Sequence, residues 1–399
     1  YCIPGNAGTS SIAENKSINL KDFEQIKDFI KKNEIDIVLV GPEQPLVDGI
    51  VDYLERYKIK VFGPSKLASQ LEGSKIFTKN LCKKYNIPTA NFGIFTNSED
   101  ANRFLEKCNL PIVIKADGLA AGKGVFIIDD YDKAYKLIND LFAGEIDGIK
   151  TSLIIIEEFL QGEEASFICL VSGDKVVPLA SSKDHKKLNN GDYGPNTGGM
   201  GAYSPTKLID KNISNIVINE IIIPTLNELK KQNIEYEGFL YAGLMIDENQ
   251  VPYVLEYNCR LGDPEAQAIL MRLESDIIDI FLATINKKLD DLEIKWKNES
   301  ACTIVLASEG YPGPYKKGIK IEGLDHEING TKVFHSGTKK KDGNFVTNGG
   351  RVISVTALGI NLQVAQAKAY DRSNQISWEG KIKRHDIGEK EINNKFIFS

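Results

Sequence analysis

A strand, a helix and a second strand follow one another within the first 63 residues, and this succession constrains the fold most strongly. Residues 35–41 (IDIVLVG) form an apolar run typical of a buried strand, residues 46–57 have a helical pattern, and residues 59–63 (IKVFG) form a second apolar run. A Gly-Pro pair closes each run. Two strands joined by a helix at this spacing lie parallel in one sheet, so we expect an N-terminal parallel βαβ unit of Rossmann-like type.

The pattern changes after a predicted helix at residues 74–86, for which Ser74 is a suitable N-cap and Pro88 an end signal. A predicted helix near 131–142 interrupts the short β-rich runs that follow, and the mixture indicates an α+β region. The β-rich runs are 111–116, 124–129, 152–159, 164–171 and 175–181.

The stretch from Asp184 to Pro205 is rich in glycine and polar residues and has almost no hydrophobic periodicity. Irregular loops of this length are uncommon in compact domains unless they serve a site. We therefore expect a long functional loop here.

The rest of the chain returns to regular patterns, and charge accumulates near 290–298, where we place a domain boundary. Pro224 is expected to kink the first of the helices that follow the loop. The predicted elements are a helix at 207–232, strands at 238–247 and 251–258, helices within 264–286, strands at 301–308, 331–338 and 351–357, and a helix at 361–371.

Length and composition indicate an ordinary globular protein of two or three domains, because 399 residues exceed the size of a typical single core. The net charge of -6 disfavours binding to nucleic acid or to an anionic membrane surface. No apolar run is long enough for a membrane span, and residues 1–30 lack the pattern of a signal peptide, so we expect a cytoplasmic protein. The six cysteines are scattered, which favours free thiols over a zinc or redox site.

Residues 115–124 (KADGLAAGKG) place Lys115 at a strand end and Lys123 in a turn of small residues. Glycines let a backbone approach phosphate oxygens, and two ammonium groups can neutralise them. The spacing is not that of a Walker A motif, because Gly118 and Gly122 enclose three residues instead of four. We expect a flexible glycine loop that closes over a triphosphate; the alternative is a hairpin with solvated lysines.

Two further strands end in polar groups. Residues 154–160 (IIIEEFL) finish at an edge that could bind an adenine and a ribose hydroxyl, although a strand that simply meets solvent at Glu157 is the alternative.

In LEYNCR, Glu256 and Asn258 lie on one face of a predicted strand, and two hard oxygen ligands suit Mg²⁺. Arg260 is expected on the same face as Glu256 and Asn258, and its guanidinium could pair with a carboxylate. Asp263 is predicted to cap the next helix, ahead of Pro264.

His185 is the one histidine that we place near chemistry, because it lies in the long loop next to an acidic and a basic residue. The amides of residues 194–201 in the same loop could help to hold a small zwitterion. RHDIG at 384–388 superficially matches metal phosphohydrolases, but it lacks further His and Asp partners, so we interpret it as a chance match.

Together these motifs resemble the phosphoribosylamine–glycine ligase family, also called glycinamide ribonucleotide synthetase, within the ATP-grasp superfamily. The resemblance covers essentially the whole chain, and the segments GPNTGGMG and NCRLGDPE separate this family from other ATP-grasp members. The matching segments are PGNAGT at 4–9, GPEQPLV at 41–47, LEGSK at 71–75, IKADGLAAGKGV at 114–125, EEFLQGEEASF at 157–167, DHK at 184–186, GPNTGGMGAYSP at 194–205, LEYNCRLGDPE at 255–265 and TNGGRV at 347–352.

The resemblance implies three domains: an N-terminal substrate domain at 1–72, a central ATP-grasp domain at 73–290 with a lid at about 90–165, and a small β-rich C-terminal domain at 298–399. It also implies that glycine attacks the γ-phosphate of ATP to give glycyl phosphate, from which the amine of 5-phosphoribosylamine displaces phosphate in an early step of purine synthesis. The implied cofactors are ATP and Mg²⁺, or Mn²⁺. The implied partners are these small substrates, without nucleic acid or membrane, and the implied state is a monomer.

Site roles follow from the resemblance residue by residue. Lys75, Lys115 and Lys123 would contact the ATP phosphates, Glu157, Glu158, Phe159 and Leu160 the adenine, and Glu164 the ribose; Glu256 and Asn258 would hold the metal; Glu43, Asp184, His185, Lys186, Thr197 and Arg260 would bind substrate; and Arg260, Asp184 and Lys123 would act in catalysis.

Two features depart from the family pattern. Members begin with a strand and a turn of the type GxGGREH, and we expect that part, roughly thirty residues as in one βα unit, to be absent here together with part of the phosphoribosylamine site. Many ATP-grasp enzymes also carry another acid on the strand before the Glu-x-Asn pair, where this chain reads YAGL at 241–244. A second metal would therefore lack one ligand.

Two alternative functions remain open. The first is another ATP-grasp carboxylate–amine ligase or carboxylase with a different acceptor, against which the loop at 184–205 argues. The second is a non-catalytic nucleotide-binding protein of the same fold. The three phosphate lysines, together with Glu256 and Asn258, argue against that second alternative.

Overall fold

The computed structural model describes residues 1–119, 124–146, 149 and 151–396. Its N-terminal unit contains the predicted parallel βαβ arrangement, because Val38 pairs with Val61 in a two-stranded parallel sheet. The predicted helix at 46–57 is two helices, since Gly49 adopts a left-handed conformation (φ +97°) that ends the first and precedes the second. The elements of this unit are η1 (Thr9–Ser11), α1 (Phe23–Lys32), β1 (Val38–Leu39), α2 (Glu43–Asp48), α3 (Ile50–Glu55) and β2 (Val61–Phe62).

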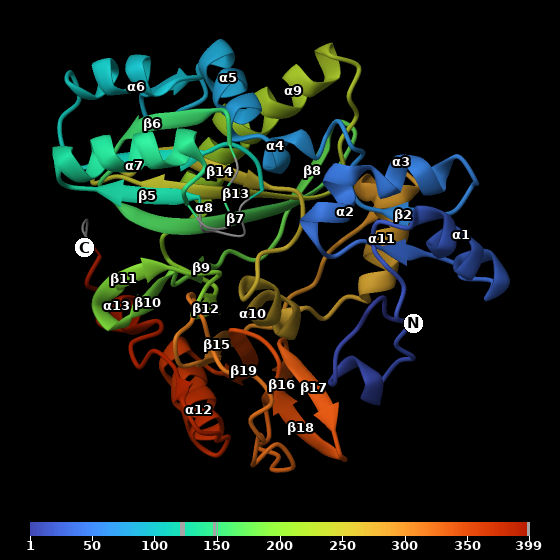
Figure 1. The fold of residues 1–399 in the computed structure, drawn as a ribbon. Helices are drawn as coiled ribbons and strands as arrows, with labels where there is room; N and C mark the ends of the chain where they lie inside the picture. The colour runs from blue at the N-terminus through green and yellow to red at the C-terminus, as the bar shows by residue number, and fades with distance from the viewer. Residues whose placement is uncertain (120–123, 147–148, 150, 397–399) are drawn as a thin grey trace.

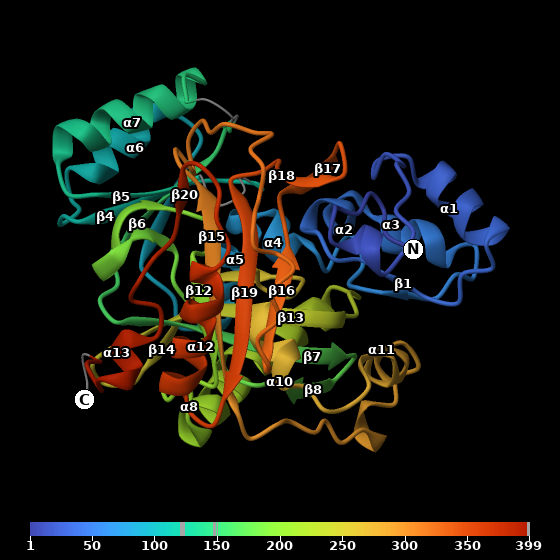
Figure 2. The same ribbon diagram turned by 90° about the horizontal axis from the view of Figure 1, so that it is seen from below.

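A four-stranded antiparallel sheet of order β3-β6-β4-β5 follows two short connecting helices. Helices α6 and α7 lie together on one side of this sheet in both views (Figure 1, Figure 2). Their apolar faces enclose a core of their own, separate from the main core. The elements are α4 (Gln70–Gly73), α5 (Lys75–Tyr85), β3 (Phe92–Phe95), α6 (Ser98–Leu105), β4 (Ile112–Ala116), β5 (Val125–Ile128), α7 (Tyr131–Ala143) and β6 (Ile154–Glu158).

The central sheet has the order β14-β13-β7-β8 and is antiparallel throughout. Its long middle strands are almost wholly buried, which matches the apolar runs in the sequence. The helical stretch predicted to kink at Pro224 contains a π-helical segment that ends just before this proline. The elements are β7 (Glu163–Ser172), β8 (Lys175–Pro178), α8 (Lys211–Ile216), η3 (Val217–Ile222), α9 (Ile223–Lys231), β13 (Glu237–Ile246) and β14 (Pro252–Asn258).

The expectation of a long irregular loop at 184–205 is wrong, because most of this segment is short strands. β10 and β11 form an antiparallel hairpin, and β12 pairs with β9 on one side and with β15 on the other. The strands are two to four residues long and rich in glycine and asparagine, so they carry no visible hydrophobic period. They are β9 (Lys183–Asp184), β10 (Lys187–Asn189), η2 (Asn190–Asp192), β11 (Tyr193–Asn196) and β12 (Gly201–Ser204).

The C-terminal sheet has the order β16-β19-β15-β12-β9, with β20 also paired to β15, so two of its strands come from the middle of the chain. Helix α12 packs against β15 and β19 beside a third apolar core. None of the described helices is both long and apolar enough to cross a membrane. The remaining elements are α10 (Glu265–Arg272), α11 (Ile277–Ile285), η4 (Leu289–Asp291), β15 (Ser300–Ser308), β16 (Thr331–His335), β17 (Thr338–Lys341), β18 (Asn344–Thr347), β19 (Arg351–Gly359), α12 (Leu362–Asn374), β20 (Lys381–Ile382) and α13 (Glu389–Ile392).

Candidate active site

Glu256, near the end of β14, forms an ion pair with Lys186, which follows β9. The Lys186 Nζ lies 3.1 Å from Glu256 Oε1 and 3.5 Å from Oε2 of Glu164 on β7. Attraction by Lys186 is the main reason that the pKa of Glu256 falls to about 2, with burial acting in the opposite direction. Burial acts to lower the pKa of Lys186, but Glu256 and Glu164 hold it well above its usual value. Glu256 is therefore ionised, and Lys186 protonated, at neutral pH.

Two carboxylic acids, Asp184 and Glu265, lie beside this ion pair and are more deeply buried than it is. Burial, followed by the charge of Glu265, raises the pKa of Asp184 well above its usual value, while Lys186 opposes the rise. The Ser166 hydroxyl donates to Glu265 Oε1 at 3.0 Å and lies 3.0 Å from the Tyr241 hydroxyl. The sequence prediction included Asp184 but missed Glu265, although Glu265 ends the quoted NCRLGDPE segment.

Asn258 shares a face of β14 with Glu256. The register of β14 against β13 is regular from Glu256 to Asn258, where Gly243 faces Glu256 and Tyr241 faces Asn258. Tyr257 between them is buried in the main core, so the two polar side chains are on the opposite face, as predicted.

Glu157 on β6 joins two lysines in a buried triad. Its Oε2 lies 2.9 Å from Nζ of Lys115 on β4 and 3.1 Å from Nζ of Lys79 on α5. Lys115 also donates to the carbonyl of Leu255 at 3.2 Å, directly before Glu256. The sequence prediction missed Lys79, although it lies four residues after Lys75 in a predicted helix and hence on the same helix face.

Lys75 is the first residue of α5, and Ser74 caps this helix as predicted by accepting from the Phe77 amide at 3.1 Å. The Lys75 Nζ donates to the Gly118 carbonyl at 2.7 Å. Burial lowers the pKa of Lys75, with the carboxylates of Glu256 and Asp117 opposing. Lys123 lies outside the described residues, so its predicted role stays a prediction.

The predicted adenine edge follows directly on the triad. Glu158 ends β6, is exposed, and accepts from the Asn91 amide at 2.8 Å and from Asn91 Nδ2 at 3.0 Å. Phe159 and Leu160 are half-buried beyond the strand. Their assignment to adenine stays a prediction.

Arg260 links the loop after β14 to the N-terminal unit. Its Nε lies 3.3 Å from Glu43 Oε2, and its Nη2 lies 3.0 Å from Glu72 Oε1. Burial acts to lower the pKa of Arg260, but Glu72 and Glu43 together raise it. The structure thus brings together two predicted substrate residues, Glu43 and Arg260, and adds Glu72. Glu72 also accepts from the backbone amide of Cys259 at 2.7 Å.

Thr197 and His185 have structural contacts in this segment. The Thr197 hydroxyl donates to the Lys186 carbonyl at 2.8 Å and accepts from the Gly199 amide at 3.0 Å. His185 is buried, and its Nε2 accepts from the Gly388 amide at 3.3 Å. Thr197 therefore lies at the backbone of Lys186, whereas the His185 ring contacts the C-terminal segment.

The prediction that Asp263 caps the next helix is wrong. Helix α10 starts at Glu265, and its N-cap position is Pro264, without a side-chain cap. The Asp263 carboxylate instead pairs with Arg351 of β19 (Nη2–Oδ2 2.9 Å), and Arg351 also donates to the Gly198 carbonyl at 2.7 Å. A contact between distant segments has replaced the local cap.

Comparison with known proteins agrees with this geometry. The three domain profiles of phosphoribosylglycinamide synthetase match in order: the N domain over residues 1–72, the ATP-grasp (A) domain over 73–266 and the C domain over 301–390. The chain is 49% identical over 395 residues to a phosphoribosylamine–glycine ligase from Vibrio vulnificus, covering 98% of this chain and 92% of that protein.

Solved structures show that the fold is similar as well as the sequence. A phosphoribosylamine–glycine ligase from Thermotoga maritima superposes with a TM-score of 0.83 and 37% identity, covering 96% of this chain and 93% of the other. The biotin carboxylase domain of a Hydrogenobacter thermophilus 2-oxoglutarate carboxylase has a TM-score of 0.73 at 16% identity, with coverage of 95% and 85%, and so shares the fold. The chain belongs to the phosphoribosylglycinamide synthetase family.

Proposed function

We propose that this chain joins glycine to 5-phosphoribosylamine at the expense of ATP, giving glycinamide ribonucleotide, ADP and phosphate in purine biosynthesis. The observation that carries the proposal is its near full-length identity of 49% to a protein named for this reaction. The charged cluster formed by Lys75, Lys115, Lys186 and Glu256 supports it, because ligation through phosphoryl transfer needs charge neutralisation more than acid–base catalysis.

Membership of the ATP-grasp family implies ATP together with a divalent metal. For the nucleotide, we assign Lys75, Lys115 and Lys123 to the phosphates, the edge at 157–160 to the adenine and Glu164 to the ribose. Lys115 is buried and Lys75 is half-buried, which supports the phosphate assignment, because an ammonium shielded from water attracts an anion more strongly.

We assign Glu256 and Asn258 to Mg²⁺ or Mn²⁺. The donor set fits a hard cation: Glu256 is ionised at neutral pH, and Asn258 offers an amide oxygen from the same strand face. Among the residues that the structure describes, no group of three or more His, Cys, Asp and Glu side chains forms a closed metal cage. Two protein ligands suit a cation whose other positions are taken by phosphates and water, and when bound it would neutralise charge on the transferring phosphoryl group.

Glycine would bind between groups of opposite charge. In the proposed reaction its carboxylate oxygen attacks the γ-phosphorus, the bond to the ADP oxygen breaks, and glycyl phosphate forms. The phosphoribosylamine nitrogen then attacks the glycyl carbonyl, phosphate leaves, and the nitrogen loses a proton. We assign Asp184 to the glycine ammonium, Lys186 and Arg260 to the carboxylate and acyl phosphate, and His185, Thr197 and Glu43 to the surrounding pocket.

We further propose a monomeric, cytoplasmic enzyme that acts on small substrates alone. We propose domains at 1–72, 73–290 and 298–399, with residues of about 90–165 acting as a lid over the nucleotide. The separate apolar core enclosed by α6, α7 and their sheet supports a lid that moves as a unit.

Isotope transfer tests the proposed chemistry. Glycine labelled with ¹⁸O in its carboxylate should give one labelled oxygen in each released phosphate, because the oxygen that attacks the γ-phosphorus leaves with the phosphate. Phosphate released without label would mean that water attacks ATP, and it would exclude the glycyl phosphate route.

A further inference from the structure

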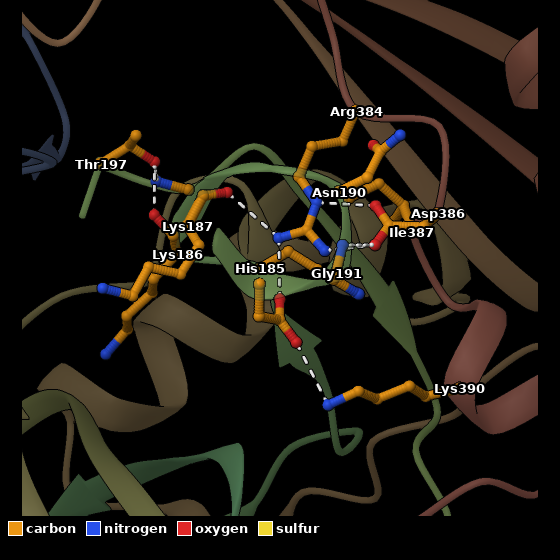
Figure 3. Close-up of polar contacts among 12 residues, drawn as sticks. His185, Lys186, Lys187, Asn190, Gly191, Thr197, Arg384, Asp386, Ile387 and Lys390 are labelled. Atoms are coloured by element: carbon orange, nitrogen blue, oxygen red, sulfur yellow. Dashed lines mark hydrogen bonds and ion pairs between the residues drawn. The ribbon is translucent and has the colours of Figure 1, made fainter. Parts of the chain in front are cut away.

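The RHDIG segment, interpreted from the sequence as a chance match, makes several hydrogen bonds and ion pairs to the turn at residues 190–192 between β10 and β11. Arg384 has a side chain only 1% exposed, and its guanidinium makes two bonds to Asp386, at 2.8 Å from Nε and 2.7 Å from Nη2. Its Nη1 bonds Asp192 Oδ1 at 2.8 Å and the Lys187 carbonyl at 3.1 Å. Figure 3 shows Arg384 between Asp386 and the Lys187 backbone.

Other residues of the C-terminal segment contact the turn at residues 190–192, which joins β10 to β11. Asp386 Oδ2 accepts from the Gly191 amide at 2.7 Å, and the His385 amide donates to Asn190 Oδ1 at 2.8 Å. Lys390 lies 3.2 Å from Asp192 Oδ2. The turn therefore has contacts at three successive residues, 190, 191 and 192.

The backbone of this turn is strained at one residue, Asp192. Gly191 and Asp192 both adopt left-handed conformations, with φ of +70° and +59°. Glycine takes this conformation freely, whereas for an L residue such as Asp192 it costs free energy, though less for aspartate than for most side chains. The ion pairs of Asp192 with Arg384 and Lys390 offset this cost. Burial acts to raise the pKa of Asp192, but these ion pairs outweigh burial and lower the pKa to about 2.

The hairpin leads directly to the groups assigned to glycine. The Lys187 carbonyl that Arg384 binds belongs to the residue after Lys186, whose Nζ contacts Glu256. Thr197, at the other end of the hairpin, bonds the Lys186 carbonyl through both its amide and its hydroxyl. A shift of the turn would therefore move Lys186 and Thr197 together.

We propose that Arg384 is a positioning residue for the glycine site: with Asp386 and Lys390 it fixes the β10–β11 hairpin, and thereby Lys186, from the far end of the chain. This inference rests on the proposed function, which assigns Lys186 and Thr197 to glycine. Lys186 also lies beside Glu256 and Glu164, but the phosphates of ATP are assigned to lysines on other elements, so KM should rise more for glycine than for ATP.

Steady-state kinetics and hydrogen exchange on the whole chain test this role. Arg384→Lys keeps the positive charge but loses the planar guanidinium with its several donors. Asp192→Asn removes the negative charge of the ion pair and leaves one acceptor oxygen. Each variant should raise KM for glycine roughly tenfold or more, with KM for ATP changed less than about twofold, because small displacements of binding groups have effects of this size. Amides of residues 187–196 should exchange faster.

Arg372→Lys is the matched control, because Arg372 is equally buried in the C-terminal domain but donates to the Leu324 carbonyl, away from the hairpin. An unchanged KM for glycine, or equal rises in both KM values, in both test variants would overturn the positioning role. If the unmodified chain shows no glycine-dependent turnover, the proposed function fails instead. The exchange rates of residues 187–196 would then still decide whether Arg384 fixes the hairpin.

Discussion

A neutral imidazole lies buried at His185, close to the charges of Arg384 and Lys183. Burial, followed by these two charges, lowers the pKa of His185 to about 3. The unfolded chain would bind a proton at this histidine below about pH 6.5, whereas the folded chain would not bind it until about pH 3. Acidification from pH 6.5 therefore favours the unfolded state, and stability from this residue is lost as the pH falls.

We predict that the free energy of unfolding falls by about 2 kcal/mol more between pH 7 and pH 5 in the unmodified chain than in His185→Gln, because the shifted proton equilibrium has this size. Denaturant titrations at the two pH values measure the difference. His326→Gln, at an exposed histidine, is the control and should keep the full pH dependence. Equal slopes in the unmodified chain and His185→Gln would contradict the account.

The buried triad of Lys79, Glu157 and Lys115 gives a second prediction at single residues. Lys79→Met should destabilise the fold by about 1–3 kcal/mol, because Glu157 would lose one of its two buried partners. In a double-mutant cycle with Glu157→Gln, denaturant unfolding should reveal a coupling of at least about 1 kcal/mol. The more exposed pair Lys136–Asp140, at 2.9 Å against 3.1 Å for Lys79–Glu157, should give a coupling of no more than about 0.5 kcal/mol. Additive effects in the buried pair would refute its energetic role.

At the scale of elements, two turns are packed against each other at Gly199. This residue has φ +111°, and an added Cβ would lie 2.4 Å from Cδ of Pro264. The contact therefore joins the turn after Thr197 to the turn before α10, which carries the buried Glu265.

Gly199→Ala should lower kcat/KM for glycine by roughly tenfold or more and destabilise the chain, because the two turns must separate. Gly173→Ala is the matched control: its φ of +61° is also left-handed, but an added Cβ would meet nothing within 4 Å. Gly173→Ala should lower the free energy of unfolding by about 1 kcal/mol, from backbone strain alone, and leave kcat/KM for glycine unchanged. If both alanine variants have the same stability and activity, the packing of the two turns is unimportant.

Elements with a long hydrophobic period could be predicted from the sequence, and those set by distant contacts could not. The strand pair β13–β14 lies close to its predicted ranges because apolar residues dominate it. Helix α12 lies close to its predicted range because its buried residues, among them Ala365 and Ala369, recur at helical spacing. The hairpin at 187–196 was missed because its strands are short and polar and are held by Arg384, almost two hundred residues later. Asp263 failed as a predicted cap for the same reason, since Arg351 binds it from another domain.

At the scale of the whole molecule, the site is assembled from several parts of the chain. Glu43 and Glu72 meet Arg260 from the N-terminal side, and Lys186 meets Glu256 from the segment that also supplies strands to the C-terminal sheet. The sequence resemblance could predict part of the cluster, such as Glu43, Arg260 and Glu256, because family motifs identify these residues, but it missed Glu72, Glu265 and Lys79. It could not predict the pairing between them, which depends on sheet register and domain packing.

The most direct measurement of the central claim is phosphate release from ATP and Mg²⁺ by this chain, with glycine and freshly generated 5-phosphoribosylamine supplied together or singly. We predict release only when both substrates are present, with glycinamide ribonucleotide formed in equal amount, and loss of release in Glu256→Gln. Phosphate release that is the same without glycine or without phosphoribosylamine would contradict the ligase function, and so would ATP binding without any turnover.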